Sequence, residues 1–397
     1  MKRFLLAANF MLISLCNVAA QGYFISGIVL DSASKRPINN ALVLIDGTTQ
    51  MQLTDSSGTF KFTMQDKEPA TVLVARKSYQ TEAYEAKGDR NISMRFYLFK
   101  SKNIPVNSPQ VEKNAPQFQS LFLQHLLGNS SITQSCEILN PGDLRFSIDE
   151  TNQRVLVVGV APIQIINEPM GYLLNTIVDD FTFSLRSNAE ETNVFIGFKS
   201  LTSSNPTVLD RWKNNRSAAY KGSFMHFIRA LCAGRVEEEG FNVSLIKRVY
   251  EDDPNYTNEF KVRDRKGEEQ FRLPGGNMIV KKYVDIIDNS SKSELALAKF
   301  DSVSHEWKLN NHHSMMRVVY NTYFGWFNDM DAVEKASAAY DYLLDAEGKP
   351  VSLIVDHESS PCIIYKSGRI KKSGSMIFLG YWSQHDLATS LPFDYQP

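Results

Sequence analysis

The sequence has 397 residues, of which 43% are hydrophobic and 22% are charged, and its 43 basic and 44 acidic residues leave a net charge of −1. This composition excludes a disordered chain, and the balanced charge argues against nucleic acid or an anionic membrane surface as a partner. A chain of this length is expected to form two or three domains of about 100–200 residues.

Residues 1–20 have the pattern of a secretion signal peptide. Two basic residues precede an apolar run at residues 4–16 that is too short to cross a bilayer, and small residues before Gln21 provide a cleavage site. Cys16 leaves open a lipidated N-terminus. We expect an exported protein with no transmembrane helix after the signal peptide, because no later segment has about 18 uninterrupted apolar residues.

Residues 21–100 are expected to form a small domain of short strands. Residues rich in β-branched and aromatic side chains mark strands at 24–30, 41–45, 71–75 and 92–99. Turn residues separate them, including Asp46-Gly47 and Gly58, which supplies a positive φ. This spacing predicts an all-β sandwich.

The same stretch resembles the carboxypeptidase-regulatory-like family, which has a transthyretin-type sandwich fold. The resemblance rests on Gly27, Val29, Asp31, Pro37, Ala41, Val43, Gly47, Thr54, Asp55, Gly58 and Phe60. It implies a seven-stranded type of sandwich without peptidase activity of its own. Asp31, Asp46 and Asp55 are interpreted as turn-capping carboxylates rather than calcium ligands, because Asp bonds its own backbone in such loops.

Residues 101–117 are polar and contain three prolines, which predicts a semi-extended linker. A short amphipathic helix is expected at residues 118–127, ended by Gly128.

Residues 118–397 are predicted to form a larger, strand-rich α+β domain of unknown function, so that the whole chain is mainly β or α+β. One long helical segment is expected at residues 208–239, bent or split at Gly222 and closed by Gly240. A turn is expected at Lys266-Gly267. Strands are expected at residues 144–148, 154–160, 163–166, 172–185, 193–201, 241–250, 259–262, 278–287, 293–300, 315–323, 351–357 and 376–381.

Parts of this larger region are similar to a second, uncharacterised family of exported proteins of Gram-negative bacteria that carry the sandwich in front. The similar residues lie at 136–141, 161–172, 211–241 and 380–395, and they include Arg211-Trp212, Gly380-Tyr381-Trp382 and Leu391-Pro392-Phe393. The resemblance implies an architecture and a location in the periplasm, outer membrane or cell surface. It implies no established activity.

The sequence lacks the motifs of the common hydrolases. A zinc carboxypeptidase needs an H-x-x-E pair and a third ligand. None of the seven histidines has Glu three residues on: His125, His226, His305, His312, His313, His357 and His385. The G-x-S-x-G elbow of serine hydrolases is also missing. We therefore predict no metal and no cofactor, and the catalytic residues, if the protein is an enzyme, stay unknown.

Three cysteines follow the signal peptide: Cys136, Cys232 and Cys362. Their odd number allows one disulfide and a free thiol, or three buried thiols, so that the pairing stays open. His226 precedes Cys232 by six residues and His357 precedes Cys362 by five. Both cysteines are nevertheless interpreted as core residues rather than nucleophiles.

Five residues along the expected helix make up the candidate ligand or partner face: Arg211, Arg216, Tyr220, His226 and Arg229. Residues three apart on a helix are neighbours, which brings His226 next to Arg229. Such a face suits an anionic ligand or a partner protein. The alternative is a solvated or internally paired face, with the acidic residues at 237–239 as its partners.

These observations favour an exported cell-envelope protein that acts as a non-enzymatic binding or assembly protein. It would contact an envelope protein or a glycan through its C-terminal domain. One alternative is a periplasmic hydrolase with an unrecognised His-containing site. The other is a small outer-membrane β-barrel, which is disfavoured because the strands lack sustained alternation over about 10 residues.

Overall fold

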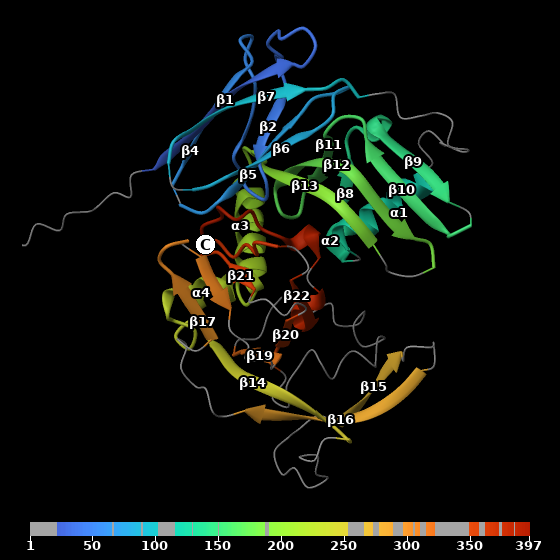
Figure 1. Ribbon diagram of the computed structural model, residues 1–397, viewed down its shortest axis with the longest axis vertical. Coiled ribbons are helices and arrows are strands. Elements are labelled where there is room, and N and C mark those ends of the chain that lie inside the picture. The colour runs from blue at the N-terminus through green and yellow to red at the C-terminus, as the bar shows by residue number, and fades with distance from the viewer. Residues whose placement is uncertain are drawn as a thin grey trace, which may run out of the picture.

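The computed structural model shows three strand-rich units, which follow one another along the chain (Figure 1). A blue sandwich comes first, a green sheet second, and a yellow-to-red pair of sheets last, with the C-terminus lying between the units. The mainly β, α+β class predicted from the sequence is confirmed. The structure describes residues 22–65, 67–88, 90–101, 116–128, 130–149, 151–186, 190–252, 266–272, 278–288, 297–304, 306–309, 315–321, 349–356, 362–372, 375–384 and 386–397.

The first unit is the predicted sandwich of two sheets. One sheet has the order β4-β1-β7, with β1 (Tyr23–Asp31) antiparallel to β4 (Thr59–Met64) and parallel to β7 (Ile92–Leu98). The other has the order β3-β2-β5-β6, formed by β3 (Met51–Leu53), β2 (Leu42–Ile45), β5 (Ala70–Ala75) and β6 (Glu82–Ala86). Alternate side chains of both sheets, among them Ile25, Val43 and Phe62, point inward and form the core.

Of the three aspartates predicted to cap turns, Asp31 and Asp55 do so. Asp31 Oδ1 accepts from the backbone N–H of Ser34 at 2.7 Å, and bonds from Ser34 lower the pKa of Asp31 to about 2. Asp55 Oδ1 accepts from the N–H groups of Ser57 and Thr59 at 2.9 and 2.8 Å. The Asp46 carboxylate differs from these two, because it accepts a hydrogen bond from Ile196 N of the second unit.

The second unit is a sheet built around the long strand β12 (Tyr172–Ser184). This strand pairs with β11 (Ile163–Asn167), β10 (Arg154–Gly159) and β13 (Glu190–Ser200), while β8 (Cys136–Ile138) and β9 (Leu144–Asp149) extend the sheet. One face is covered by α1 (Pro116–Leu127), whose Phe122 ring meets Phe181 edge-on at 5.3 Å. The predicted linker lies largely outside the described residues, whereas α1 confirms the helix expected after it.

The opposite face of this sheet packs on the sandwich. Ile177 and Phe195 contact the outward-facing leucines of β2 and β5, which include Leu44 and Leu73. Gly197 allows this close approach, since a Cβ there would lie 2.7 Å from Met51 Cε. The first two units are therefore joined by an apolar interface.

The long helix predicted at residues 208–239 is instead two helices, α3 (Pro206–Tyr220) and α4 (Phe224–Ala233). Gly222 separates them with a φ of 72°, and the Ser223 side chain then caps α4 by accepting from His226 N at 3.2 Å. The second helix ends at Gly234, which adopts a left-handed conformation, and not at Gly240 as predicted. The sequence predicts either a bend or a split at Gly222, and the structure shows the split.

The third unit contains a six-stranded antiparallel sheet of order β15-β16-β14-β19-β20-β22. It comprises β14 (Phe241–Tyr250), β15 (Lys266–Arg272), β16 (Met278–Asp288), β19 (Met315–Tyr320), β20 (Val351–Asp356) and β22 (Met376–Gly380). A smaller sheet pairs β17 (Ala298–Asp301), β18 (Glu306–Leu309) and β21 (Ile363–Ile364).

The predicted turn at Lys266-Gly267 is wrong, because these two residues begin β15, and the strands β18 and β21 were not predicted. Four of the seven residues of β15 are charged, and β18 and β21 have only four and two residues. Such segments carry little of the alternation that marks a strand. The strand expected at residues 259–262 lies outside the described residues.

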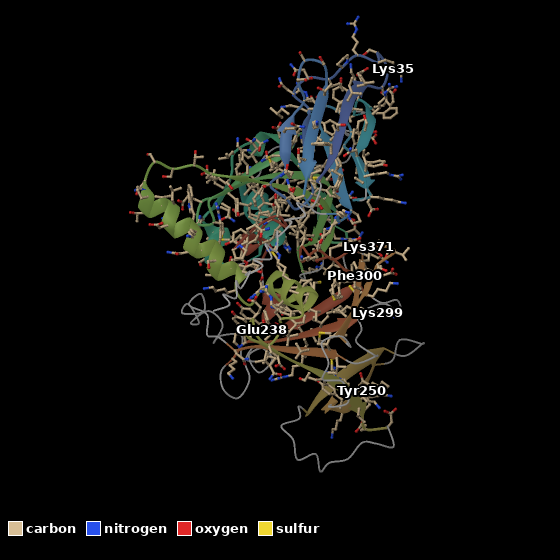
Figure 2. The ribbon with its side chains drawn as sticks, turned by 90° about the vertical axis from the view of Figure 1, so that its left-hand side faces the viewer. Lys35, Glu238, Tyr250, Lys299, Phe300 and Lys371 are labelled. Carbon is tan, nitrogen blue, oxygen red and sulfur yellow. The ribbon has the colours of Figure 1, made fainter. Side chains whose placement is uncertain are left out.

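The chain ends with two short 3₁₀ turns, η4 (Tyr381–Gln384) and η5 (Leu387–Thr389), and then residues 391–395, which we call the C-terminal strap. Figure 2 shows Lys35 near one end of the molecule and Tyr250 toward the other, with Lys371 between them. Within the described ranges, no helix is both long enough and apolar enough to span a bilayer.

Candidate functional site

Two adjoining hollows lie where the three units meet. The larger has a volume of about 420 Å³ and is bordered by the sandwich, β13, α4 and the chain after β22. Its apolar wall is formed by Ile196, Phe198, Phe224, Phe378, Trp382 and Phe393. Ser223, Thr389, Ser390 and Asp46 add a few polar groups. An apolar hollow of this size with a few convergent polar groups is typical of ligand sites in proteins.

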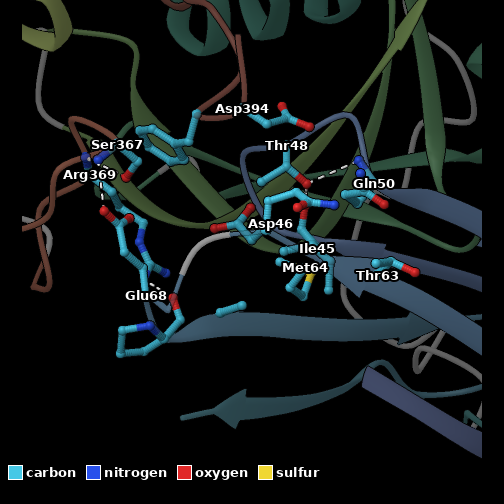
Figure 3. A pocket seen from close by; sticks show the side chains of 14 residues that line it. Ile45, Asp46, Thr48, Gln50, Thr63, Met64, Glu68, Ser367, Arg369 and Asp394 are labelled. Atoms are coloured by element: carbon cyan, nitrogen blue, oxygen red, sulfur yellow. Dashed lines mark hydrogen bonds between the residues drawn. The ribbon is translucent and has the colours of Figure 1, made fainter. Parts of the chain in front are cut away.

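The smaller hollow has a volume of about 110 Å³ and is bordered by more charged residues than the larger one (Figure 3). Asp46, Glu68, Arg369 and Asp394 are its charged residues among those described. Figure 3 shows the Asp46 side chain between Thr48 on one side and Glu68 and Arg369 on the other. Asp46 and Phe393 border both hollows, so that the two adjoin each other.

The turn after β2 positions Asp46 at this junction. Gly47 adopts a φ of 69°, and its N–H donates to Ile196 O at 2.8 Å, while Asp46 Oδ1 accepts from Ile196 N at 3.0 Å. These two bonds attach the turn to β13. A Cβ on residue 47 would lie 2.4 Å from Phe393 Cε2, so glycine is also required for the Phe393 ring to pack there.

The C-terminal strap is held from both sides. Phe393 N donates to Gly47 O at 2.7 Å, and the Asp394 carboxylate accepts from Thr49 N at 2.9 Å. On the opposite side, Arg229 of α4 donates to Phe393 O at 2.9 Å and to Tyr395 O at 2.8 Å. The strap therefore fixes Phe393 between the sandwich and α4.

Burial dominates the electrostatics of Asp46. It raises the pKa of this carboxyl above its usual value, while the Ile196 N–H and the positive charge of Arg369 act in the opposite direction. Arg369 donates to Pro69 O and stacks over the Tyr365 ring at 4.7 Å, and Glu68 Oε1 accepts from Ser367 N at 2.8 Å. Arg369 and Glu68 thereby attach the loop after β21 to the sandwich.

The structure separates the five residues of the predicted face. Arg211 is exposed and forms an ion pair with Glu168. Arg216 donates to the carbonyl oxygens of Met170 and Gly171 at 2.7 Å each and lies over the Tyr172 ring at 4.0 Å. Both arginines thus contact the turn between β11 and β12 and border neither hollow, while the charge of Arg216 also acts on Tyr395 of the strap.

The other three residues of that face lie close together near the strap. Tyr220 and His226 are buried, with ring centroids 4.8 Å apart, and Arg229 lies over Tyr220 at 5.5 Å. His226 Nδ1 accepts from Gly222 N at 3.0 Å, and its Nε2 is 3.3 Å from Glu239. Burial lowers the pKa of His226, although Glu239 counteracts this shift. These contacts are intramolecular, and a ligand or partner on this face stays a prediction.

No disulfide joins the three cysteines that the structure describes. Burial raises the pKa of the Cys136 and Cys232 thiols to about 12, and Cys362 Sγ lies 3.1 Å from Ser375 Oγ. His125 stacks on Phe183 at 4.4 Å, and the remaining five histidines lie outside the described residues. In the part of the chain that the structure describes, no three His, Cys, Asp or Glu side chains form a metal-binding group.

The sequence analysis missed the hollows altogether. The sequence predicts Asp46 as a turn residue and gives Trp382 and Phe393 only as residues similar to the second family, and nothing in their spacing brings the three together. Only the docking of the sandwich turn on β13 and the course of the strap do so.

Comparison with known proteins identifies the first unit. The family model of the CarboxypepD_reg-like domain matches residues 25–111, which confirms the resemblance seen in the sequence. No curated protein matches the chain.

Three solved structures show weak likeness. A candidate membrane-associated protein of unknown function from Bacteroides fragilis is 8% identical, with 67% of this chain and 95% of that chain covered and a TM-score of 0.17. A candidate carbohydrate binding protein from Bacteroides uniformis is 7% identical, with 45% and 79% covered and a TM-score of 0.16. A 9R-lipoxygenase from Cyanothece is 11% identical, with 55% and 49% covered and a TM-score of 0.17. At such TM-scores these likenesses carry no argument.

Proposed function

We propose that this chain, whose residues 25–111 match the CarboxypepD_reg-like family model, is an exported, non-enzymatic binding protein of the bacterial cell envelope. Its C-terminal region would bind part of an envelope protein or glycan in the larger hollow. The observation that carries the proposal is this hollow of about 420 Å³ at the junction of all three units.

The chemistry of the hollow favours binding over catalysis. Aromatic and aliphatic side chains form most of its wall, and the polar groups at its border are mainly hydroxyls. The Ser223 hydroxyl is already used to cap α4. Apolar walls supply affinity, and a few polar groups fix the orientation of a ligand.

Export is the second part of the proposal, and the pattern of residues 1–20 supports it. Fractionation of the source cells tests it, together with the N-terminal sequence of the recovered protein. We expect the protein in the envelope fraction with Gln21 at its N-terminus. Recovery of uncleaved protein from the cytoplasm would contradict export.

A matched pair of variants tests the binding site. Val194 lies at the border of the larger hollow and is half-buried, so Val194→Phe would fill part of the space. Val280→Phe is the control, since Val280 is a strand valine that is 50% exposed and borders neither hollow.

Tagged mature protein and both variants would be used to recover components from an envelope extract. We expect wild type and Val280→Phe to recover the same component and Val194→Phe to lose it. An identical set of components recovered by all three proteins would rule out the larger hollow as the binding site.

A further inference from the structure

We propose that the smaller hollow, which is bordered by four charged residues, belongs to the same binding site and takes an uncharged, hydroxyl-bearing end group of the ligand. The apolar part of that ligand would lie in the larger hollow. This inference rests on the proposed function, and it adds the chemical class of the ligand.

The shared border of the two hollows is the first argument. Asp46 and Phe393 line both, and Phe393 is held in place by backbone bonds to Gly47 O and Arg229. A ligand that extends from one hollow to the other must therefore pass the Asp46 carboxylate and the Phe393 ring. It meets a hydrogen-bond acceptor and an apolar surface at the same point.

Hydrogen-bonding capacity is the second argument. An ionised carboxylate has about four acceptor sites, and a guanidinium has five N–H donors. Asp46 Oδ1 accepts from Ile196 N, Glu68 Oε1 accepts from Ser367 N, and Arg369 donates to Pro69 O. These bonds use only part of the capacity of the three side chains, and acceptors and donors both remain.

The balance of charges selects among possible end groups. The hollow has three carboxylates, Asp46, Glu68 and Asp394, and one guanidinium, Arg369. An anionic end group would be repelled by the carboxylates. A cationic end group would be attracted by the three carboxylates, but an ammonium group is a donor only and would leave the remaining N–H donors of Arg369 without an acceptor. A hydroxyl both donates and accepts, so neighbouring hydroxyls can satisfy both kinds of side chain.

A series of probes with one apolar tail and different ends tests this inference. The probes are octyl β-glucoside, octanol, octylammonium and octanoate, each below its micelle-forming concentration. Binding to the mature protein would be measured by calorimetry and by tryptophan fluorescence, to which Trp382 at the border of the larger hollow contributes. We expect the affinity of octyl glucoside to be at least about tenfold higher than that of octanol. Octanoate should have the lowest affinity of the four probes.

Asp46→Asn removes the charge of this side chain while nearly keeping its shape. We expect it to weaken octyl glucoside binding about tenfold and to leave octanol binding unchanged. Glu68→Gln serves as a second variant, and thermal unfolding shows whether each variant is folded. If neither variant folds, the probe series on the wild-type protein still tests whether the smaller hollow prefers an uncharged, hydroxyl-bearing end group.

The outcomes separate the two proposals. If all four probes bind equally and Asp46→Asn has no effect, the inference is overturned, while the larger hollow remains the binding site. Stronger binding of octylammonium or octanoate than of octyl glucoside overturns the inference in the same way. If no probe binds at all, both the inference and an apolar binding site in the larger hollow are overturned.

Discussion

Replacing Arg229 should destabilise the protein far more than replacing Arg211, although both belonged to one predicted face. Arg229 Nη1 and Nη2 donate to Tyr395 O and Phe393 O at 2.8 and 2.9 Å, and its Nε donates to Ser367 O at 3.2 Å. Arg229→Met keeps most of the apolar stem and removes all three bonds. The matched control is Arg211→Met, which removes an ion pair with Glu168.

The structure sets the expected size of both effects. Each lost hydrogen bond contributes about 1 kcal/mol net, so Arg229→Met should lower the free energy of unfolding by about 3 kcal/mol. The side chains of Arg211 and Glu168 are 49% and 47% exposed. An exposed ion pair of this kind contributes about 0–1 kcal/mol, so Arg211→Met should have little effect.

Urea unfolding followed by tryptophan fluorescence measures both differences. Hydrogen exchange at residues 393–395 adds a local readout, because Arg229→Met should release the strap before the whole protein unfolds. Equal effects of the two variants, or unchanged exchange in the strap, would refute the structural role assigned to Arg229.

Three further predictions concern the junction and the thiols. Gly47→Ala should destabilise the protein by about 1–3 kcal/mol, since residue 47 has a positive φ and faces the Phe393 ring; an unchanged melting temperature would contradict this. Because the folded-state pKa of Asp46 is raised, the wild type loses stability as the pH rises from about 4 through that pKa. Asp46→Asn lacks this loss, so the free energy of unfolding of the variant relative to wild type should increase from pH 3.5 to pH 7. If this difference in free energy did not change with pH, the Asp46 carboxyl would not be desolvated in the folded protein. Cys136 and Cys232 should react slowly with a thiol reagent at pH 8 until the protein is unfolded, because burial raises their pKa; rapid labelling of the native protein at these two positions would disprove their burial.

Local sequence patterns predicted most of the strands and the first unit. The alternation in residues 24–30 and 41–45, and glycine at positions 47 and 58, correspond to β1, β2 and their turns. Such patterns are local, since side chains alternate within a strand and a positive φ favours glycine. The break at Gly222 could be anticipated for the same reason.

The candidate site depends on contacts between residues far apart in the chain. Asp46 reaches Ile196 across 150 residues, and Arg229 reaches Tyr395 across 166. Spacing along a helix placed Arg211 and Arg229 in one group, yet Arg211 in the first half of α3 pairs with Glu168, whereas Arg229 of α4, beyond the break at Gly222, contacts the strap. The sequence by itself determined the sandwich, most strands and the break between the helices, because short-range backbone and side-chain preferences govern them. Only the tertiary structure decided that Asp46, Trp382 and Phe393 border one pair of hollows, because docking of the three units and the strap brings them together.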